Sequence, residues 1–175
     1  MHTQMKFQIT INAPAHKVWQ IWAREFDHIG RWAAAIEESC ADTNIPAPDG
    51  AEMGGRVCSA QGFGDVREEF TYYDEASMRF GYKATKGLPA WLIKRAENNC
   101  SVHPLGPNKC MIKSRGEIDY ALIPGLFLMP VFKFQLSRIA DRLFEELKYY
   151  AEQDQPHPRK LQAQQKLLPK NSVPS

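Results

Sequence analysis

The sequence lacks the patterns that mark metal, disulfide or nucleotide sites. Its five histidines are scattered, and no pair has the spacing of a zinc motif, so we expect no bound metal. Its four cysteines show no close-pair spacing, which predicts free thiols in a reducing cytoplasm. Glycines at 54, 55, 62 and 64 punctuate turns and do not join a strand to a helix. No phosphate-binding loop and no cofactor are therefore predicted.

Long apolar runs are also missing. The longest, Ala121–Phe132, is too short to span a bilayer and contains two prolines, so we expect no stable membrane insertion. No apolar run follows Met1, so we expect no secretory signal. Both observations favour a cytoplasmic location.

The chain carries little excess of charge of either sign. It has 22 Lys and Arg against 20 Asp and Glu. After Glu152 there is one acid, Asp154, against four bases: Arg159, Lys160, Lys166 and Lys170. Residues 1–152 are thus left without the basic excess that a nucleic-acid surface needs, so no nucleic-acid partner is expected. The sequence leaves the oligomeric state open between a monomer and a homodimer.

One long segment, Val131–Glu152, has a clear helical period. Its apolar residues recur every three or four positions and form one stripe: Phe132, Leu136, Ile139, Leu143, Leu147 and Tyr150. Roughly twenty residues at ~1.5 Å each give a helix about 30 Å long. Such a helix must lay its apolar stripe on a broad partner.

Most of the chain before this helix alternates between apolar and polar residues, as half-buried strands do. The predicted strands are Lys6–Asn12, Ile36–Thr43, Arg56–Gln61, Val66–Tyr73, Met78–Thr85, Trp91–His103 and Cys110–Tyr120. Two short helices are predicted after the first strand, over Ala15–Arg24 and around Phe26–Trp32. Tight turns between consecutive strands predict an antiparallel sheet.

These elements predict an α+β fold in which a curved antiparallel sheet of about seven strands wraps around the long C-terminal helix. A curved sheet cannot touch the helix along its whole length, so a cavity is expected between them. Ile123–Pro130 is predicted to be an apolar loop that leads into the helix. We expect one domain over residues 1–152 and a disordered Gln/Pro/Lys-rich tail over 153–175.

Several phrases along the chain carry a family resemblance. They are Ile11–Pro14 with Val18–Trp19, Phe26–Trp32, Glu68 with Tyr73–Glu75, Gly116–Glu117, and Glu146–Glu152. In this order and spacing, over roughly residues 5 to 152, they resemble the START-like, or SRPBCC, superfamily. That superfamily includes the birch-pollen allergens and the polyketide cyclase/dehydrase group. The resemblance implies a helix-grip fold with a site for lipids, sterols, polyketides or quinones between helix and sheet.

Three side chains are candidates for orienting or converting a ligand. If Val66–Tyr73 and Met78–Thr85 form a hairpin, alternation places Glu68, Tyr72 and Tyr82 on the inner face. A carboxylate on an apolar wall can act as an acid or base, and tyrosine hydroxyls can orient a ligand carbonyl. The alternative is that these side chains have only structural roles: Glu68 pairs with an arginine or water, and the tyrosines pack in the core.

A second group of candidates is an apolar rim in loops and short helices: Phe26, Trp32, Leu88, Trp91, Leu126, Phe127 and Met129. Two loops, Gly87–Trp91 and Ile123–Met129, are expected to gate the pocket, and a variant dips the second loop into a membrane surface. Ser114 stands where relatives often carry a large aromatic residue, which would enlarge the cavity. The predicted ligand-binding residues are Phe26, Trp32, Glu68, Phe70, Tyr72, Met78, Phe80, Tyr82, Trp91, Ile112, Ser114, Leu126, Phe127, Met129, Phe132, Leu136 and Ile139.

Three functions fit these features. The first is binding or transport of an apolar small molecule of lipid, polyketide or quinone type. The second is a cyclase or dehydratase that uses the same cavity, and the third is a protein-interaction module that uses the apolar rim. The sequence favours the first function and keeps the other two as alternatives, because one fold hosts many functions.

Overall fold

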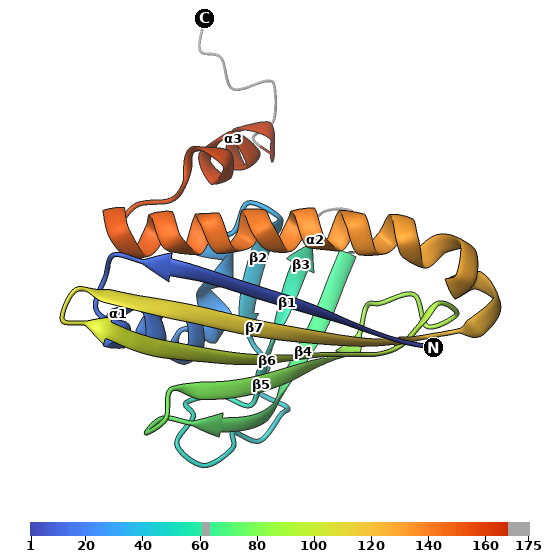
Figure 1. Ribbon diagram of the computed structural model, residues 1–175, viewed down its shortest axis with the longest axis horizontal. Helices are drawn as coiled ribbons and strands as arrows, with labels where there is room; N and C mark the ends of the chain where they lie inside the picture. Colours follow the sequence, from blue (N-terminus) through green and yellow to red (C-terminus); the bar gives the residue numbers. More distant parts are fainter. Residues whose placement is uncertain (61–63, 168–175) are drawn as a thin grey trace, which may run out of the picture.

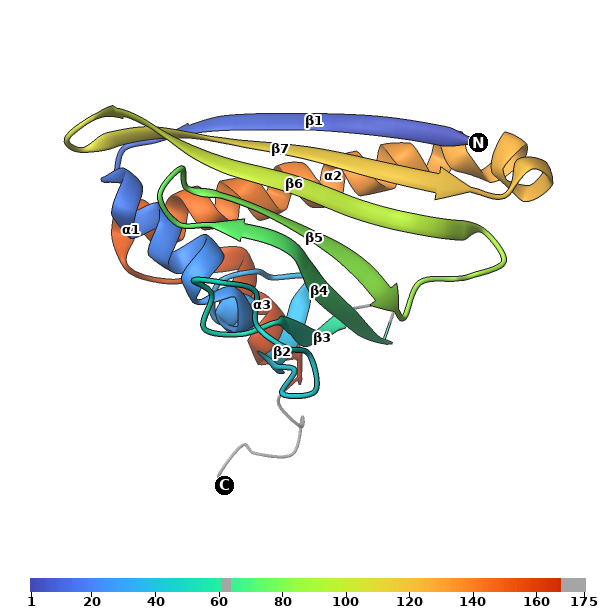
Figure 2. The same cartoon turned by 90° about the horizontal axis from the view of Figure 1, so that it is seen from below.

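The computed structural model describes residues 1–60 and 64–167, except for the side chains of residues 123–130 and 132. A curved antiparallel sheet wraps around one long helix (Figures 1 and 2). The strands are β1 (His2–Ile11), β2 (Ile36–Ala41), β3 (Gly55–Ala60), β4 (Gly64–Asp74), β5 (Arg79–Lys86), β6 (Ile93–Gly106) and β7 (Lys109–Tyr120). The helices are α1 (Ala15–Trp19), η1 (Gln20–Arg24), η2 (Phe26–Arg31), α2 (Leu122–Gln153) and α3 (Pro158–Leu167).

The strand order is β1-β7-β6-β5-β4-β3-β2, and every neighbouring pair is antiparallel. This confirms the predicted helix-grip fold: one strand, short helices, six further strands and a long C-terminal helix. Sequential strands pair from β2 to β7, and β1 then joins β7 at the other side of the sheet. We call the face covered by α2 the inner face.

The hydrophobic core lies at one end of the molecule, beneath α1, η1 and η2. The π-helical segment η1 continues α1 directly and brings Trp19, Trp22 and Phe26 onto the inner face of β4 and β5. Phe80 packs edge-on against Trp22, with their ring centroids 5.2 Å apart. Because these rings fill the space between sheet and helices here, the cavity must lie elsewhere along α2.

The two halves of α2 have different surroundings. In the C-terminal half, Leu147 and Ala151 are fully buried against the core. Nearer the N-terminus, Leu136 is half-buried and Ile139 is 40% exposed. The apolar stripe of α2 therefore packs against the core in its C-terminal half. In its N-terminal half it leaves apolar surface over the inner face of the sheet.

The helix α2 begins earlier than the sequence predicts. Residues 123–130 belong to the helix, so the prediction of an apolar loop at Ile123–Pro130 is wrong. Pro124 lies in the first turn, where a backbone N–H has no acceptor within the helix, so proline is tolerated there. The proline and glycine residues in this stretch suggested a loop, and the helical context overrides that preference.

The structure also differs from the predicted tail. A helix, α3, forms over Pro158–Leu167, and Lys160 within it is 1% exposed. Its ammonium Nζ donates to the carbonyl oxygen of Ile36 at 2.7 Å, and the pKa of Lys160 is lowered by burial. Arg159 binds two carboxylates of α2. The polar side chains that suggested a disordered tail therefore anchor α3 to the rest of the fold. Residues 168–175 lie outside the described part.

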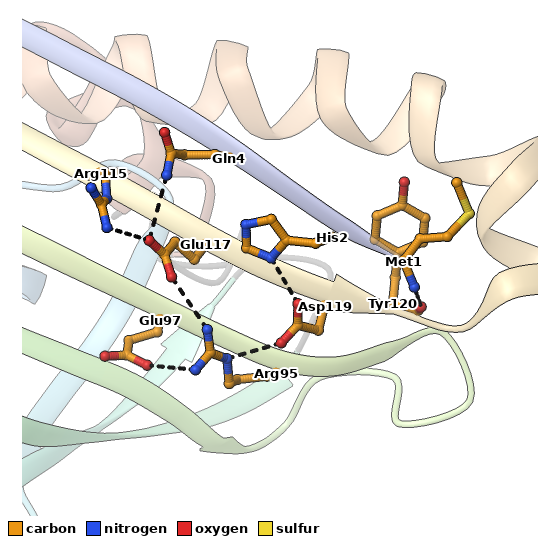
Figure 3. Close-up of polar contacts among 9 residues, drawn as sticks. All are labelled: Met1, His2, Gln4, Arg95, Glu97, Arg115, Glu117, Asp119 and Tyr120. Carbon is orange, nitrogen blue, oxygen red and sulfur yellow. Dashed lines mark hydrogen bonds and ion pairs between the residues drawn. The ribbon is translucent and has the colours of Figure 1, made fainter.

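The outer face of β1, β7 and β6 carries a polar network (Figure 3). Arg95 on β6 binds Asp119 at 3.0 Å and Glu117 at 3.3 Å, both on β7. From β1, His2 Nδ1 lies 2.8 Å from Asp119, and Gln4 Nε2 donates to Glu117 at 3.5 Å. Exposed ion pairs contribute little singly, but this network joins three strands in one register. It therefore fixes which alternate residues face inward.

Among the helices in the described part of the chain, none is long and apolar enough to cross a membrane.

Candidate functional site

A cavity of about 280 Å³ lies between the inner face of the sheet and the N-terminal half of α2. Strands β1, β4, β5, β6 and β7 form its floor, and α2 forms its roof. Its apolar lining comes mainly from Met5, Phe7, Val66, Ala84, Leu88, Ile93, Ala96, Ile118, Leu136, Ile139, Ala140, Leu143 and Phe144. Such an enclosure removes apolar ligand surface from water, which is the main source of affinity in pockets of this kind.

Strand register brings a row of polar side chains across this apolar floor. Tyr82 on β5 pairs with Asn98 on β6, which in turn pairs with Gly116 on β7. Directly paired residues share a face, so Tyr82 and Asn98 face the cavity together. Gly116 makes room for the amide, because a Cβ there would come within 2.9 Å of Asn98 Oδ1. This close approach is the reason for a glycine inside β7.

Glu68 enters the cavity wall as half of an ion pair. It pairs with Arg56 across β3 and β4, and its Oε2 accepts from Arg56 Nε at 2.7 Å and lies 2.6 Å from Nη2. Arg56 also donates to the carbonyl oxygen of Phe26 at 2.6 Å and lies over the Phe26 ring at 3.7 Å. Within the described residues, no group hydrogen bonds to Glu68 Oε1. That oxygen can accept a hydrogen bond from a ligand.

The two groups have protonation properties that suit binding. Burial lowers the pKa of the Arg56 guanidinium, but the Glu68 charge, the nearby Cys58 and Tyr82, and the hydrogen bond to Glu68 together outweigh it, so the pKa is raised and Arg56 stays charged. Burial raises the pKa of Tyr82 well above its usual range, and the Glu68 charge adds to this. Tyr82 is therefore a neutral phenol at physiological pH and can donate a hydrogen bond. Its hydroxyl has no hydrogen-bond partner among the described residues.

The buried thiols are poor nucleophiles. Burial raises the pKa of Cys100 to about 12 and that of Cys110 to about 11. Cys100 Sγ lies 3.8 Å from Ser114 Oγ, a weak contact at the cavity floor. Because the thiolate is the reactive form, these cysteines act as small apolar side chains.

Five of the sequence-predicted ligand residues line the cavity: Glu68, Tyr82, Ser114, Leu136 and Ile139. They come from four different elements, β4, β5, β7 and α2. Tyr82 on β5 and Ser114 on β7 therefore point to the inner face, as predicted.

Tyr72 lies on the outer face, and its predicted inward orientation is wrong. A bulge between Phe70 and Tyr72 inserts one residue into β4, and every side chain after it changes face. Tyr73 therefore joins Phe70 in the core, with ring centroids 5.6 Å apart. Tyr72 instead lies over Gly81, where an added Cβ would come within 2.5 Å of its ring. The alternation in sequence continues through this point and gives no sign of the bulge.

Six other predicted residues lie in or against the core and do not line the cavity: Phe26, Trp32, Phe70, Met78, Phe80 and Ile112. Phe70, Phe80 and Ile112 point inward as predicted, but at the end of the sheet that the short helices fill. Phe26 and Trp32 were predicted at the apolar rim, and that placement is wrong, because they are 1% and 2% exposed and belong to the core. Phe26 still supports the site, because its ring lies 5.2 Å from that of Tyr82. The sequence indicates which side chains face the inner side of the sheet, but it does not indicate how far along α2 the core extends.

The predicted rim is only partly described. Leu88 lines the cavity, whereas Trp91 beside it is 60% exposed and does not. The side chains of Leu126, Phe127, Met129 and Phe132 lie outside the described residues, so their predicted role stays a prediction. The gating role of Gly87–Trp91 likewise stays a prediction.

Arg56, Asn98 and strand β1 contribute to the site, although the sequence did not predict it. Met5 and Phe7 alternate on the same strand as Ile9 and Ile11, which was a usable signal. Asn98 lies in a polar stretch with no alternation, and Arg56 is the first residue of a short predicted strand. Only the strand register reveals that Asn98 faces the cavity and that Arg56 lies beside Glu68 in the cavity wall.

Across residues 1–60 and 64–167, no group of three or more His, Cys, Asp or Glu side chains could hold a metal ion. The site instead combines an apolar enclosure with a short polar row. Such an arrangement can desolvate a ligand, orient one polar group of it, and hold a neutral phenol near a carboxylate.

Comparison with known proteins places this architecture in a family. The family described as "Polyketide cyclase / dehydrase and lipid transport" matches residues 2–152. No curated protein matches the chain.

Solved structures support the same fold. A START superfamily protein from Mycobacterium smegmatis has a TM-score of 0.65 and 17% identity, over 87% of this chain and 99% of that one. XoxI from Bacillus cereus has a TM-score of 0.68 and 12% identity, over 89% and 99%. A norcoclaurine synthase from Thalictrum flavum, in complex with a transition-state analogue, has a TM-score of 0.61 and 16% identity, over 84% and 94%. Because the family model matches residues 2–152, the chain belongs to the family of polyketide cyclase, dehydrase and lipid-transport domains.

Proposed function

We propose that the protein binds and carries a small, mainly apolar molecule in the cavity between the sheet and α2. The observation that carries this proposal is the lining itself: apolar side chains from five strands and one helix, with a few convergent polar groups. A volume of about 280 Å³ is close to the lower end of the ~300–1,000 Å³ range of ligand pockets. It favours a single chain or a small ring system of lipid, polyketide or quinone type over a two-chain lipid.

Desolvation supplies most of the binding free energy in this proposal. Burying ~300 Å² of apolar ligand surface at ~25 cal/mol/Å² gives about 7 kcal/mol before ordering costs are subtracted. The hydroxyl of Tyr82 and Oε1 of Glu68 then orient the ligand, since a polar group without a partner is costly to bury. The family membership supports this function, because lipid transport is part of the family's description.

Native mass spectrometry of the freshly purified protein tests the proposal. We expect a discrete extra mass that is released on denaturation, or one-to-one saturable binding when the neutral apolar probe N-phenyl-1-naphthylamine is added. An apo mass combined with no saturable probe binding would contradict the proposal. That outcome would favour a role for exposed apolar residues such as Trp91 in contacting a protein partner.

A second candidate function is a cyclase- or dehydratase-type enzyme. The observation that favours it is the joint presence of Glu68 and Tyr82 in one cavity, because a carboxylate and a neutral phenol can move protons on a bound chain. The family description includes this chemistry. In this reading the ion pair with Arg56 fixes the position of the Glu68 carboxylate in the cavity wall.

The double substitution Glu68→Gln with Tyr82→Phe separates the two functions. A carrier should keep its affinity for N-phenyl-1-naphthylamine within about threefold, because both changes preserve side-chain volume. An enzyme should lose turnover by about 10²-fold or more, as general acid–base groups do. The measurements are probe titration and product formation from a polyketide-type substrate, with the exposed Glu52→Gln as a control.

A further inference from the structure

A second hollow, of about 380 Å³, lies on the flank of α2. It is bounded by α2, by α3 and by Ala34 and Ala35, which precede β2. We call it the α2–α3 groove. Ile139 and Leu143 line both this groove and the ligand cavity, so the two hollows meet along one side of α2. Ile139 is 40% exposed, so this side chain does not form a tightly packed wall between the two hollows.

The groove differs from the cavity in its charge. Three cations line it, Arg142, Arg159 and Lys166, and one anion, Glu146. Glu146 is 2% exposed and already satisfied, since its carboxylate accepts from Arg159 Nε and from the backbone N–H of Ala34, each at 2.8 Å. Arg159 also binds Glu145 at 2.8 Å.

The charges of the other two cations are not neutralised by a protein partner. The side chains of Arg142 and Lys166 form no ion pair or hydrogen bond within the part of the chain that the structure describes, and both residues are exposed. They come from different helices, α2 and α3, and meet at the same groove. The apolar cavity and these two positive charges thus lie on either side of Ile139 and Leu143.

We propose that the ligand is a single-chain anionic amphiphile. Its apolar chain fills the cavity, passes between Ile139 and Leu143, and places its carboxylate or phosphate at Arg142 and Lys166 in the α2–α3 groove. The proposal rests on the proposed ligand-binding function and names the chemical class of the ligand. One of the two cations, Lys166, lies on α3, beyond residues 2–152 that match the family, whereas Arg142 lies within them.

The test compares ligands that share one chain and differ in the head. Isothermal titration of the full-length protein with decanoate, decyl phosphate and decanol measures the contribution of the anion. We expect both anions to bind about five- to tenfold more tightly than decanol at low ionic strength, as two exposed ion pairs allow. This advantage should shrink as salt is added. Whichever of decanoate and decyl phosphate binds more tightly then shows whether the head group is a free carboxylic acid or a phosphate monoester.

The double variant Arg142→Gln with Lys166→Gln should remove the advantage and leave the affinity for decanol unchanged. Lys133→Gln is the matched control, because Lys133 is an exposed cation of α2 that lines neither hollow. Equal affinities of the wild-type protein for decanoate and decanol would overturn the proposal. So would a double variant that binds decanoate as tightly as the wild-type protein. If decanol and decanoate both fail to bind, the ligand-binding function itself fails, which is a distinct result.

Discussion

At the scale of single residues, Arg56 holds the site together. It is 5% exposed, and its guanidinium contacts Glu68, the carbonyl oxygen of Phe26 and the Phe26 ring. A buried charge is tolerated only when it is paired, so removal of one partner leaves the other uncompensated. Arg56 therefore links the wall of the cavity to the helix η2 that closes the core.

We predict that Arg56→Met destabilises the protein by about 3 kcal/mol, because it leaves the Glu68 carboxylate unpaired in the cavity wall. Urea unfolding followed by circular dichroism measures this change. Lys83→Met is the control, since Lys83 forms an ion pair with Glu69 at 3.5 Å with 43% of its side chain exposed. That control should change the free energy of unfolding by less than about 0.5 kcal/mol. An equally small effect of Arg56→Met would refute this account of the pair.

The sequence predicts the orientation of single residues better than their partners. Alternation indicates that Glu68 and Tyr82 face inward, and both line the cavity. It does not name Arg56 or Asn98, because their contacts depend on the register between strands that the sequence does not specify.

At the scale of elements, Glu75 fastens the short helices to the sheet. It lies in the turn between β4 and β5, and its Oε2 accepts from Trp19 Nε1 and from Tyr73 Oη, each at 2.7 Å. Its Oε1 accepts from Arg24 Nε at 3.0 Å. The hydrogen bond from Arg24, with those from Trp19 and Tyr73, outweighs the effect of burial and lowers the pKa of Glu75 from 4.5 to about 2.

A pH dependence follows from this shift. Because the pKa of Glu75 is lower in the folded state, its stabilising contribution is fully present above pH 4.5 and is lost as the pH falls towards 2. We predict that Glu75→Gln lowers the melting temperature near pH 7 and flattens its fall between pH 4.5 and 2. Thermal denaturation across this range is the measurement. Glu52→Gln, a change at an exposed carboxylate, should leave the profile unchanged; identical profiles for the wild-type protein and Glu75→Gln would contradict the prediction.

Elements with a strong period were predictable, and irregular features were not. The alternation predicts β4 and β5, and the apolar stripe predicts most of α2. The bulge in β4 was not predictable, because the bulged stretch still alternates in sequence while Tyr72 and Tyr73 exchange faces. The helix α3 was also missed, since it is anchored by Arg159 and Lys160 and not by an apolar stripe.

At the scale of the whole molecule, the long helix α2 covers both ends of the curved sheet, and the two ends differ. The short helices fill the end near Leu147 and Ala151 and create a rigid core. At the other end α2 roofs the cavity, and the outer-face network around Arg95 keeps β1, β7 and β6 in register beneath it. The fold thus separates a region that provides stability from a region that can accept a ligand.

The central claim is that the cavity beneath α2 holds an apolar ligand, and a cavity-filling substitution tests it most directly. Ala140 faces the cavity from α2, whereas Gln135 on the same helix is exposed and lines neither hollow. The measurement is a fluorescence titration of N-phenyl-1-naphthylamine into the wild-type protein, Ala140→Phe and Gln135→Leu.

We expect saturable one-to-one binding by the wild-type protein and by Gln135→Leu, and at least about tenfold weaker binding by Ala140→Phe, because the added ring takes up ligand space. Circular dichroism confirms that each variant is folded. Folded Ala140→Phe that binds the probe as tightly as the wild-type protein would mean that the ligand lies elsewhere, and the account of the cavity would be wrong.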